Sequence, residues 1–363
     1  MRIGLLGPIA WRTPPRRYGP WEQVVSHLAE GLTRRGHEVT LFATADSETA
    51  ARLVAVCPRP LGEDPRLDAK SYELLHMAEA LRLAREEAFE LLHNHFNAHP
   101  LAFSPLVDTP VVTTLHGSAL LEPSTHLIYR RFAHLPYVSI SNAERDGLPE
   151  LRYVATVYNG VDLRQFTYSS RSEGYLAFLG RMSPKKGAHL AVELARRTGI
   201  PLKMAALIPP DERDFFEGEI RPHLDGRRIE YVGHLGPEER DRFLGGARAL
   251  VHLCTVPEPF GLALVEAQAC GTPVIGMDLG AVGEVVRHGE TGYVVHTLEE
   301  AQQAARAIDR IDRAACRRWV ESRFTVDRMV EEYERVYEAV LDASSARRSR
   351  SATASSSSRS GAV

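Results

Sequence analysis

The sequence is poor in lysine, in cysteine and in long apolar runs. Of its 44 basic residues only four are lysines: Lys70, Lys185, Lys186 and Lys203. The four cysteines form no C-x-x-C pair, so we expect free, mostly buried thiols in a reducing cytoplasm rather than disulfides. No uncharged apolar stretch reaches the roughly 18 residues that a membrane-spanning helix needs. A peripheral contact with the inner face of a membrane stays open.

Three function classes lack their sequence signals. A net charge of −3 leaves no electrostatic footprint for nucleic-acid binding, so no nucleic-acid partner is expected. A Gly-x-Ser-x-Gly nucleophile elbow is missing, which argues against a serine hydrolase. Gly4 and Gly7 after the first apolar run do not complete a dinucleotide fingerprint, which argues against a nicotinamide enzyme.

The 363 residues suffice for two domains. Short apolar runs alternate with longer amphipathic segments, which is typical of parallel sheets covered by helices on both faces. The expected strands fall into two sets of similar size: residues 2–9, 38–44, 90–95, 110–117, 137–142 and 155–160, and then residues 175–181, 202–209, 229–235, 249–256, 273–278 and 293–296. The sequence therefore predicts an α/β protein with two doubly wound, Rossmann-like halves.

The predicted domains are residues 1–165 and 166–324, joined near the polar stretch 169–174. Residues 325–341 carry one apolar stripe at helical spacing and predict a last helix. Residues 343–363 are rich in Ser and Arg with almost nothing apolar to bury, so disorder is expected there. Because ligands of open α/β sheets bind beyond the carboxyl ends of the strands, the cleft between the two halves is the expected site.

Two glutamates separated by seven residues form the most informative motif. Glu258 follows an expected strand, a tight loop comes next, and Glu266 lies about one turn into the following helix. The free amides near Gly261 and Leu262 at the start of that helix form a natural anion site. A carboxylate at Glu266 can accept hydrogen bonds from two ribose hydroxyls, and Glu258 can reach a second polyol.

A basic turn follows the first strand of the second half. Arg181 ends the strand, and Lys185, Lys186 and Gly187 precede a helix, so half of all the lysines fall in this turn. Fixed positive charge beside a glycine turn suits a diphosphate whose negative charge grows as it leaves. A solvated basic turn is an equally good interpretation of this segment alone.

Together these motifs resemble those of the family-4 retaining glycosyltransferases of the GT-B fold. The resemblance rests on Gly180-Arg181 with Lys186-Gly187, and on Glu258-Pro-Phe-Gly with Glu266, and it spans about residues 1–341. It implies two Rossmann-like domains with an interdomain cleft, a nucleotide sugar held mainly by the second domain, and acceptor contacts mainly from the first. It also implies that the helix at 325–341 crosses back to the first domain.

Carried over residue by residue, the resemblance assigns roles to nine positions. Arg181 and Lys186 would hold the diphosphate, Glu266 the ribose hydroxyls and Glu258 the donor sugar. Amides around Phe260, Gly261 and Leu262 would help to bind sugar and phosphate, and His116 would face the donor sugar. Gly19 would let the loop before the first helix approach the ligand.

Two departures from the family pattern affect backbone loops. Pro20 follows Gly19 where the family often has a second glycine, so one amide donor is lost. Gly283 precedes Glu284 where a proline is common.

A separate group, His93, His95 and His99, does not have the spacing of a known zinc site. We expect His95 on the cleft side, and His93 or His99 in a structural or acceptor-binding role.

The resemblance predicts transfer of a hexose from a UDP- or GDP-sugar, with retention at the anomeric carbon and with neither a metal nor a separate cofactor. The acceptor stays open among a saccharide, a lipid-linked sugar and a small metabolite. Two alternatives are a catalytically silent sugar-nucleotide-binding protein and a sugar-nucleotide epimerase. The Glu258/Glu266 motif and the Arg181/Lys186 pair argue against the epimerase.

Overall fold

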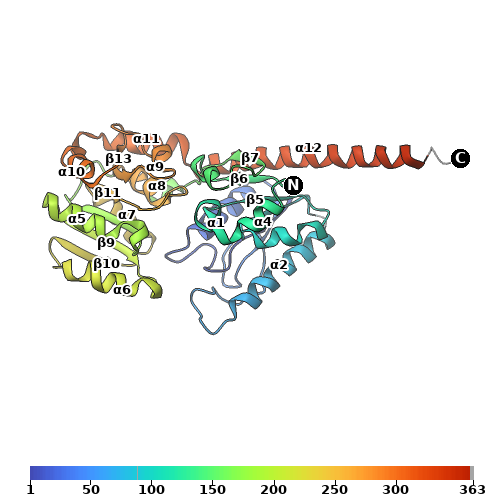
Figure 1. Cartoon of the computed structure of the whole chain (residues 1–363), viewed down its shortest axis with the longest axis horizontal. Coiled ribbons are helices and arrows are strands. Elements are labelled where there is room, and N and C mark those ends of the chain that lie inside the picture. The colour runs from blue at the N-terminus through green and yellow to red at the C-terminus, as the bar shows by residue number, and fades with distance from the viewer. Residues whose placement is uncertain (88, 360–363) are drawn as a thin grey trace.

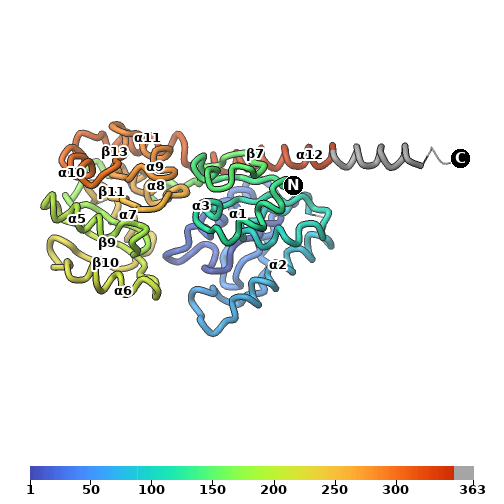
Figure 2. The backbone as a smooth tube through the Cα atoms, in the orientation of Figure 1, coloured from blue at the N-terminus to red at the C-terminus, as the bar shows by residue number. Residues whose placement is uncertain are grey.

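A computed structural model of the chain describes residues 1–87 and 89–359, with side chains up to residue 346. Two units lie side by side, each built on its own sheet (Figure 1). The colours of the tube in Figure 2 show that the chain builds the sheet of the first unit, then the second unit, and that the last helix returns to the first unit. Among the described residues no helix is both long enough and apolar enough to cross a membrane.

The first unit contains a seven-stranded parallel sheet. Its spatial order is β3 (Arg52–Val54), β2 (Glu38–Phe42), β1 (Arg2–Leu6), β4 (Leu91–Asn94), β5 (Val111–Thr114), β6 (Tyr137–Ser139) and β7 (Tyr153–Thr156). The edge strand β3 was not predicted, because its three half-buried or exposed residues carry no apolar run. The main helices of this unit are α1 (Pro20–Arg34) and α2 (Ala69–Glu86), with short α3 (Ser118–Leu121) and α4 (His126–Arg131).

The second unit repeats the arrangement with six parallel strands. The order is β10 (Ile229–Gly233), β9 (Leu202–Leu207), β8 (Leu176–Arg181), β11 (Ala249–His252), β12 (Val274–Met277) and β13 (Gly292–Val295). Its helices are α5 (Ala188–Thr198), α6 (Arg213–Phe215), α7 (Pro237–Gly246), α8 (Leu262–Ala269), α9 (Val282–Val285), α10 (Leu298–Ala307) and α11 (Arg313–Arg323). In both sheets the strand order reverses beside the first strand of the sheet, between β1 and β4 and between β8 and β11, as it does in Rossmann-like sheets. The predicted α/β fold class is therefore confirmed.

The apolar alternation in the sequence becomes three main layers of buried side chains. Strands β8, β9 and β11 pack against α5 and α10, and the opposite face of the same sheet packs against α8. In the first unit, β1, β2 and β4 pack against α1. All four cysteines are free and buried, as predicted.

The last helix, α12 (Val326–Arg359), leaves the second unit and runs along the first (Figure 1). Its apolar stripe packs beside α1 through Val330, Tyr333 and Tyr337. The sequence predicted disorder for residues 343–363. Residues 343–346 are helical and belong to α12, and disorder of the rest of the tail stays a prediction. Residues 360–363 lie outside the described part of the chain.

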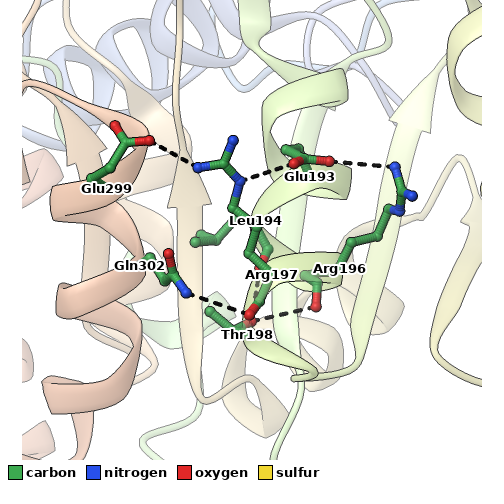
Figure 3. A network of polar contacts seen from close by, with 8 residues as sticks. Glu193, Leu194, Arg196, Arg197, Thr198, Glu299 and Gln302 are labelled. Atoms are coloured by element: carbon green, nitrogen blue, oxygen red, sulfur yellow. Dashed lines mark hydrogen bonds and ion pairs between the residues drawn. The ribbon is translucent and has the colours of Figure 1, made fainter.

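Polar contacts fasten the outer helices of the second unit. Arg197 at the end of α5 donates to Glu193 on its own helix and to Glu299 on α10, at 2.8 and 2.9 Å (Figure 3). Gln302 on α10 donates to the carbonyl of Arg197 at 3.4 Å. These exposed contacts contribute little each, and the core between α5, α10 and the sheet carries the packing.

Candidate active site

The basic turn and the Glu258 loop lie against each other at the carboxyl ends of β8 and β11. After β8 the chain forms a short 3-10 turn, Pro184–Lys186, and Gly187 then begins α5 with φ of 71°. A Cβ on Gly187 would lie 1.8 Å from the carbonyl oxygen of Leu253, so only glycine permits this approach. Thr255 in the loop after β11 donates its N–H to the carbonyl of Lys185 at 2.9 Å. Two motifs about 70 residues apart thus become neighbours.

Glu258 is the centre of a buried charged cluster. Its Oε2 accepts from Lys186 Nζ at 2.5 Å and contacts His252 Nε2 at 2.8 Å. Burial alone would raise the pKa of Glu258, but the charge of Lys186 and the hydrogen bond from His252 outweigh it and lower the pKa to about 2. Burial opposes charge on His252 too, yet contacts with Cys254 and Glu258 raise its pKa to about 9. Glu258 is therefore an anion held by two cations at neutral pH.

The same place contains the one group of side chains in the described part of the chain that offers ligand atoms for a metal ion. One ligand atom each from His252, Cys254 and Glu258 lies within 4.8 Å of the others. Nitrogen, thiolate and carboxylate ligands suit zinc. A metal here would have to displace Lys186 from Glu258 and deprotonate His252 and Cys254, so the residues present fit a lysine-occupied cluster better than a metal site.

Glu266 lies in α8, one turn beyond Gly261, as the motif predicted. It is buried, and burial raises its pKa while the charge of Arg240 partly offsets the effect. The Arg240 guanidinium approaches Glu266 Oε1 at 3.4 Å, and Arg240 Nε is buried without a hydrogen-bond partner among the described residues. The carboxylate thus has one weak ionic contact and keeps acceptor capacity for a ligand.

At the three predicted positions between Glu258 and Glu266, which are Phe260, Gly261 and Leu262, the backbone rather than the side chain is available to a ligand. Gly261 is left-handed, with φ of 90°, and caps α8. The side chain of Phe260 is buried against Tyr158 and Phe324, and Leu262 packs against core residues of both units, so neither side chain is free to bind a ligand. Any contact these two residues make with a donor would come from their backbone amides, as the resemblance implies.

Arg181 ends β8 and reaches across to the first unit. Its guanidinium donates to the hydroxyl of Tyr18 at 3.1 Å. Tyr18 stands directly before Gly19, which is the residue that caps α1, with Pro20 in the first position of the helix. The loop predicted to approach the ligand therefore lies beside the arginine predicted to hold the diphosphate.

His116 occupies the turn between β5 and α3 on the opposite side. It is buried and has φ of 49°, which is uncommon for a residue other than glycine. Its ring stacks on Trp21 of α1 at 5.6 Å between centroids, and its Nε2 lies 2.7 Å from His95 Nδ1. A Cβ on the next residue, Gly117, would lie 2.6 Å from Pro259. The His116 turn and the Glu258 loop are therefore in direct contact across the two units.

Several residues at this site were not predicted. Glu284, whose loop departs from the family pattern, accepts hydrogen bonds from the N–H groups of Asn142 and Ala143 and from the hydroxyl of Tyr158. It thus joins α9 of the second unit to the first unit. His252 ends β11 and could have been found as a polar residue at a strand end. Tyr18 belongs to the loop that contains Gly19, but the loop pattern gave its side chain no role. Arg240 carried no signal, because it belongs to no motif.

Two family models match consecutive parts of the chain. The model described as Glycosyltransferase Family 4 matches residues 21–165, and the one described as Glycosyl transferases group 1 matches residues 163–322. The two matches meet between β7 and β8, where the chain passes from one sheet to the other.

Curated proteins and solved structures agree with these models. The chain is 27% identical to glycogen synthase of Mycobacterium tuberculosis, covering 78% of this chain and 80% of that protein. It is 26% identical to N-acetyl-alpha-D-glucosaminyl L-malate synthase of Bacillus anthracis, covering 88% of this chain and 93% of that protein. The Anabaena protein HepE, solved in complex with UDP and glucose, superposes with a TM-score of 0.71 at 19% identity, covering 93% of this chain and all of that one. Neither an epimerase nor a silent binding protein is favoured by these matches.

Proposed function

The chain belongs to the family-4 glycosyltransferases of the GT-B fold, and from that premise we propose that it transfers a hexose from a UDP- or GDP-sugar to an acceptor hydroxyl, with retention at the anomeric carbon. The observation that carries this proposal is the Lys186–Glu258–His252 cluster pressed against the His116 turn. It sets fixed positive charge beside a carboxylate and an imidazole, which are the groups needed to bind a diphosphate and a sugar together.

Lys186 is suited to the leaving diphosphate because its ammonium group is only partly used. An ammonium has three N–H donors, and Glu258 accepts one of them at 2.5 Å. The other two are available for phosphate oxygens. Burial would lower the pKa of Lys186, but Glu258 raises it, so the side chain stays charged. Glu258 therefore keeps Lys186 protonated and in place, and its own second oxygen is left for a sugar hydroxyl.

In the proposed reaction the bond from the anomeric carbon to the phosphate oxygen breaks as the bond to the acceptor oxygen forms on the same face. The acceptor's proton passes to the leaving phosphate oxygen, so the products are the glycoside and a nucleoside diphosphate. Arg181 and Lys186 stabilise the charge that develops on the diphosphate. Glu266 binds the ribose, and the Gly19 loop and the His116 turn fix the donor from the other side.

Metal independence is part of the proposal, because Arg181 and Lys186 supply the charge that a divalent cation would otherwise supply. The acceptor is a saccharide, a lipid-linked sugar or a small molecule. One relative is named for a glucan product and another for L-malate, so the names support a hydroxyl acceptor without choosing its class.

The test is release of nucleoside diphosphate from UDP-glucose, UDP-galactose, UDP-N-acetylglucosamine and GDP-mannose, with and without mixtures of candidate acceptors. We expect slow release from one donor alone and faster release with an acceptor. Proton NMR of the new glycoside should show the anomeric configuration of the donor. No release from any of these donors, together with no binding of UDP or GDP, would contradict the proposal.

A further inference from the structure

A chain of buried polar side chains connects His116 to the last helix. His116 Nε2 lies 2.7 Å from His95 Nδ1, and His95 Nε2 lies 3.1 Å from His93 Nδ1. His93 Nδ1 also lies 2.8 Å from the hydroxyl of Tyr337 on α12. The other nitrogen, His93 Nε2, lies 2.8 Å from Thr114 Oγ1. Residues at positions 93 and 337 thus meet behind the turn that carries His116.

All three imidazoles are neutral. Burial lowers the pKa of His116 to about 3, and burial and the neighbouring rings lower the pKa values of His95 and His93 well below the ordinary value. A neutral imidazole has one N–H donor and one acceptor nitrogen. Each contact in the chain therefore has a direction, and the direction at one end fixes the direction at the other.

Two sets of protons satisfy the chain. In the first, Tyr337 donates to His93 Nδ1, His95 Nε2 donates to the same atom, and His116 Nε2 donates to His95 Nδ1. In the second, every one of these bonds is reversed, and Tyr337 only accepts. Each set leaves one buried hydroxyl proton without a partner among the described residues. In the second set it is the proton of Tyr337. In the first set Thr114 Oγ1 accepts from His93 Nε2 and from the hydroxyl of Tyr333, so it is the proton of Thr114.

The strengths of the donors decide between the two sets. A phenol is a stronger donor and a weaker acceptor than an aliphatic hydroxyl, and an imidazole nitrogen is a good acceptor. Leaving a buried donor without a partner costs free energy, and the cost is smaller for the weaker donor. The first set therefore has the lower free energy, because it uses the phenol of Tyr337 as a donor and leaves the weaker Thr114 hydroxyl proton without a partner.

We propose that Tyr337, acting through His93 and His95, holds His116 in the tautomer that carries its proton on Nε2, so that Nδ1 is an acceptor for a hydroxyl group of the donor sugar. His116 Nδ1 makes no hydrogen bond among the described residues, so its lone pair is left for a ligand. His93, His95 and Tyr337 are positioning residues, and the sugar as the ligand rests on the proposed function.

The test is nitrogen NMR of the ligand-free protein labelled with ¹⁵N in its histidine rings. The His116→Gln variant identifies the His116 signals by their loss. In the wild type we expect His116 Nε2 at the position of a protonated nitrogen and Nδ1 at that of an unprotonated one. A protonated Nδ1 on His116 in the wild type would overturn the inference.

Two matched variants separate the tautomer from packing. Tyr337→Phe removes the hydroxyl that contacts His93, whereas Tyr333→Phe removes a neighbouring hydroxyl on the same helix that contacts Thr114. We expect Tyr337→Phe to move both His116 signals toward the average of two tautomers, and Tyr333→Phe to leave them in place. Equal signals in the wild type and in Tyr337→Phe would contradict the role of Tyr337. The spectra are compared only for variants whose far-ultraviolet circular dichroism matches that of the wild type.

Kinetics then connect the tautomer to the sugar. Tyr337→Phe should lower kcat at least threefold relative to Tyr333→Phe, while the Kd for UDP or GDP alone stays unchanged, because no sugar is present. An unchanged kcat in a protein with averaged His116 signals would contradict the role of Nδ1 toward the sugar. If the NMR spectra are as expected but no sugar is transferred from any donor, the assignment of the His116 tautomer is supported and the proposed function is contradicted.

Discussion

Two buried histidines on the two sides of the site have opposite charge states. His252 and His116 are both about 5% exposed, and each makes close polar contacts with side chains of the site. The pKa of His252 is raised to about 9, and that of His116 is lowered to about 3. Burial lowers both pKa values, so the difference comes from the partners: His252 contacts Glu258 and Cys254, whereas His116 contacts another neutral imidazole.

The comparison extends to the two units. The second unit places fixed charges at the site through Arg181, Lys186 and Glu258, each on a loop or strand end. The first unit places a neutral, hydrogen-bonded chain there, backed by α12. A group that loses a diphosphate needs charge on the leaving side and an uncharged, oriented donor or acceptor on the sugar side. The two units therefore divide these tasks between them.

The largest expected effect is on the charged side. Replacing Lys186 by alanine removes the cation that faces Glu258 and, in the proposed reaction, the diphosphate, so kcat should fall by about 100-fold or more. The exposed neighbour Lys185 contributes only its backbone carbonyl to the loop contact, and Lys185→Ala should keep most activity. Full activity in Lys186→Ala, measured as release of nucleoside diphosphate, would contradict this role.

The two histidines should also affect stability with opposite pH dependence. For His252 the folded pKa lies above the unfolded one, so its stabilisation is complete below about pH 6.5 and is lost as pH rises toward 9. For His116 the folded pKa lies below the unfolded one, so the native state loses stability as pH falls from 6.5 toward 3.

Urea unfolding of the wild type, His252→Gln and His116→Gln between pH 4.5 and 9 measures this difference. The destabilisation caused by His252→Gln should be largest at the acid end and shrink toward pH 9, by up to about 3 kcal/mol. The destabilisation caused by His116→Gln should instead shrink as pH falls. Parallel pH profiles for the two variants would show that the charge states do not differ.

A smaller effect is expected at the junction between the units. Glu284 accepts four hydrogen bonds from the first unit, at 2.7 to 3.0 Å, so Glu284→Ala should cost about 1–3 kcal/mol of unfolding free energy. Among the described residues the exposed Glu290 pairs with Arg287 on its own segment alone, and Glu290→Ala should cost less than about 0.5 kcal/mol. Equal melting temperatures for the two variants would remove Glu284 as a link between the units.

The smallest expected effect is that of metal removal. Lys186 binds the carboxylate of Glu258, which a metal ion held by His252, Cys254 and Glu258 would need. Prior dialysis against EDTA should therefore leave the rate of donor turnover within experimental error of the untreated enzyme. Loss of activity on chelation, restored by zinc or magnesium, would contradict metal independence and show that a cation takes part in the charged side.

The sequence predicted the second unit better than the first. Lys186 and Glu258 belong to contiguous motifs between a strand and a helix, and local sequence fixes such loops. The contact of Lys186 with His252 through Glu258, and the contact of Arg181 with Tyr18, depend on where separate strands end in space. In the first unit, His93 and His95 were noticed as a cluster, but their partner Tyr337 lies on a helix that returns about 240 residues later. The periodicity of the sequence predicted that this helix has an apolar stripe. It could not show that the hydroxyls of Tyr333 and Tyr337 in this stripe make hydrogen bonds with Thr114 and His93.

The central claim is that the second unit binds a nucleoside diphosphate with Glu266 on its ribose, and thermal unfolding with UDP, GDP, ADP and TDP tests it most directly. A nucleotide at 100 times its Kd adds about 2.7 kcal/mol to the native state, which shifts the melting temperature measurably. The account predicts that UDP or GDP stabilises the wild type and that Glu266→Ala loses most of the shift. Absence of a shift with all four nucleotides, or an equal shift in Glu266→Ala, would contradict it.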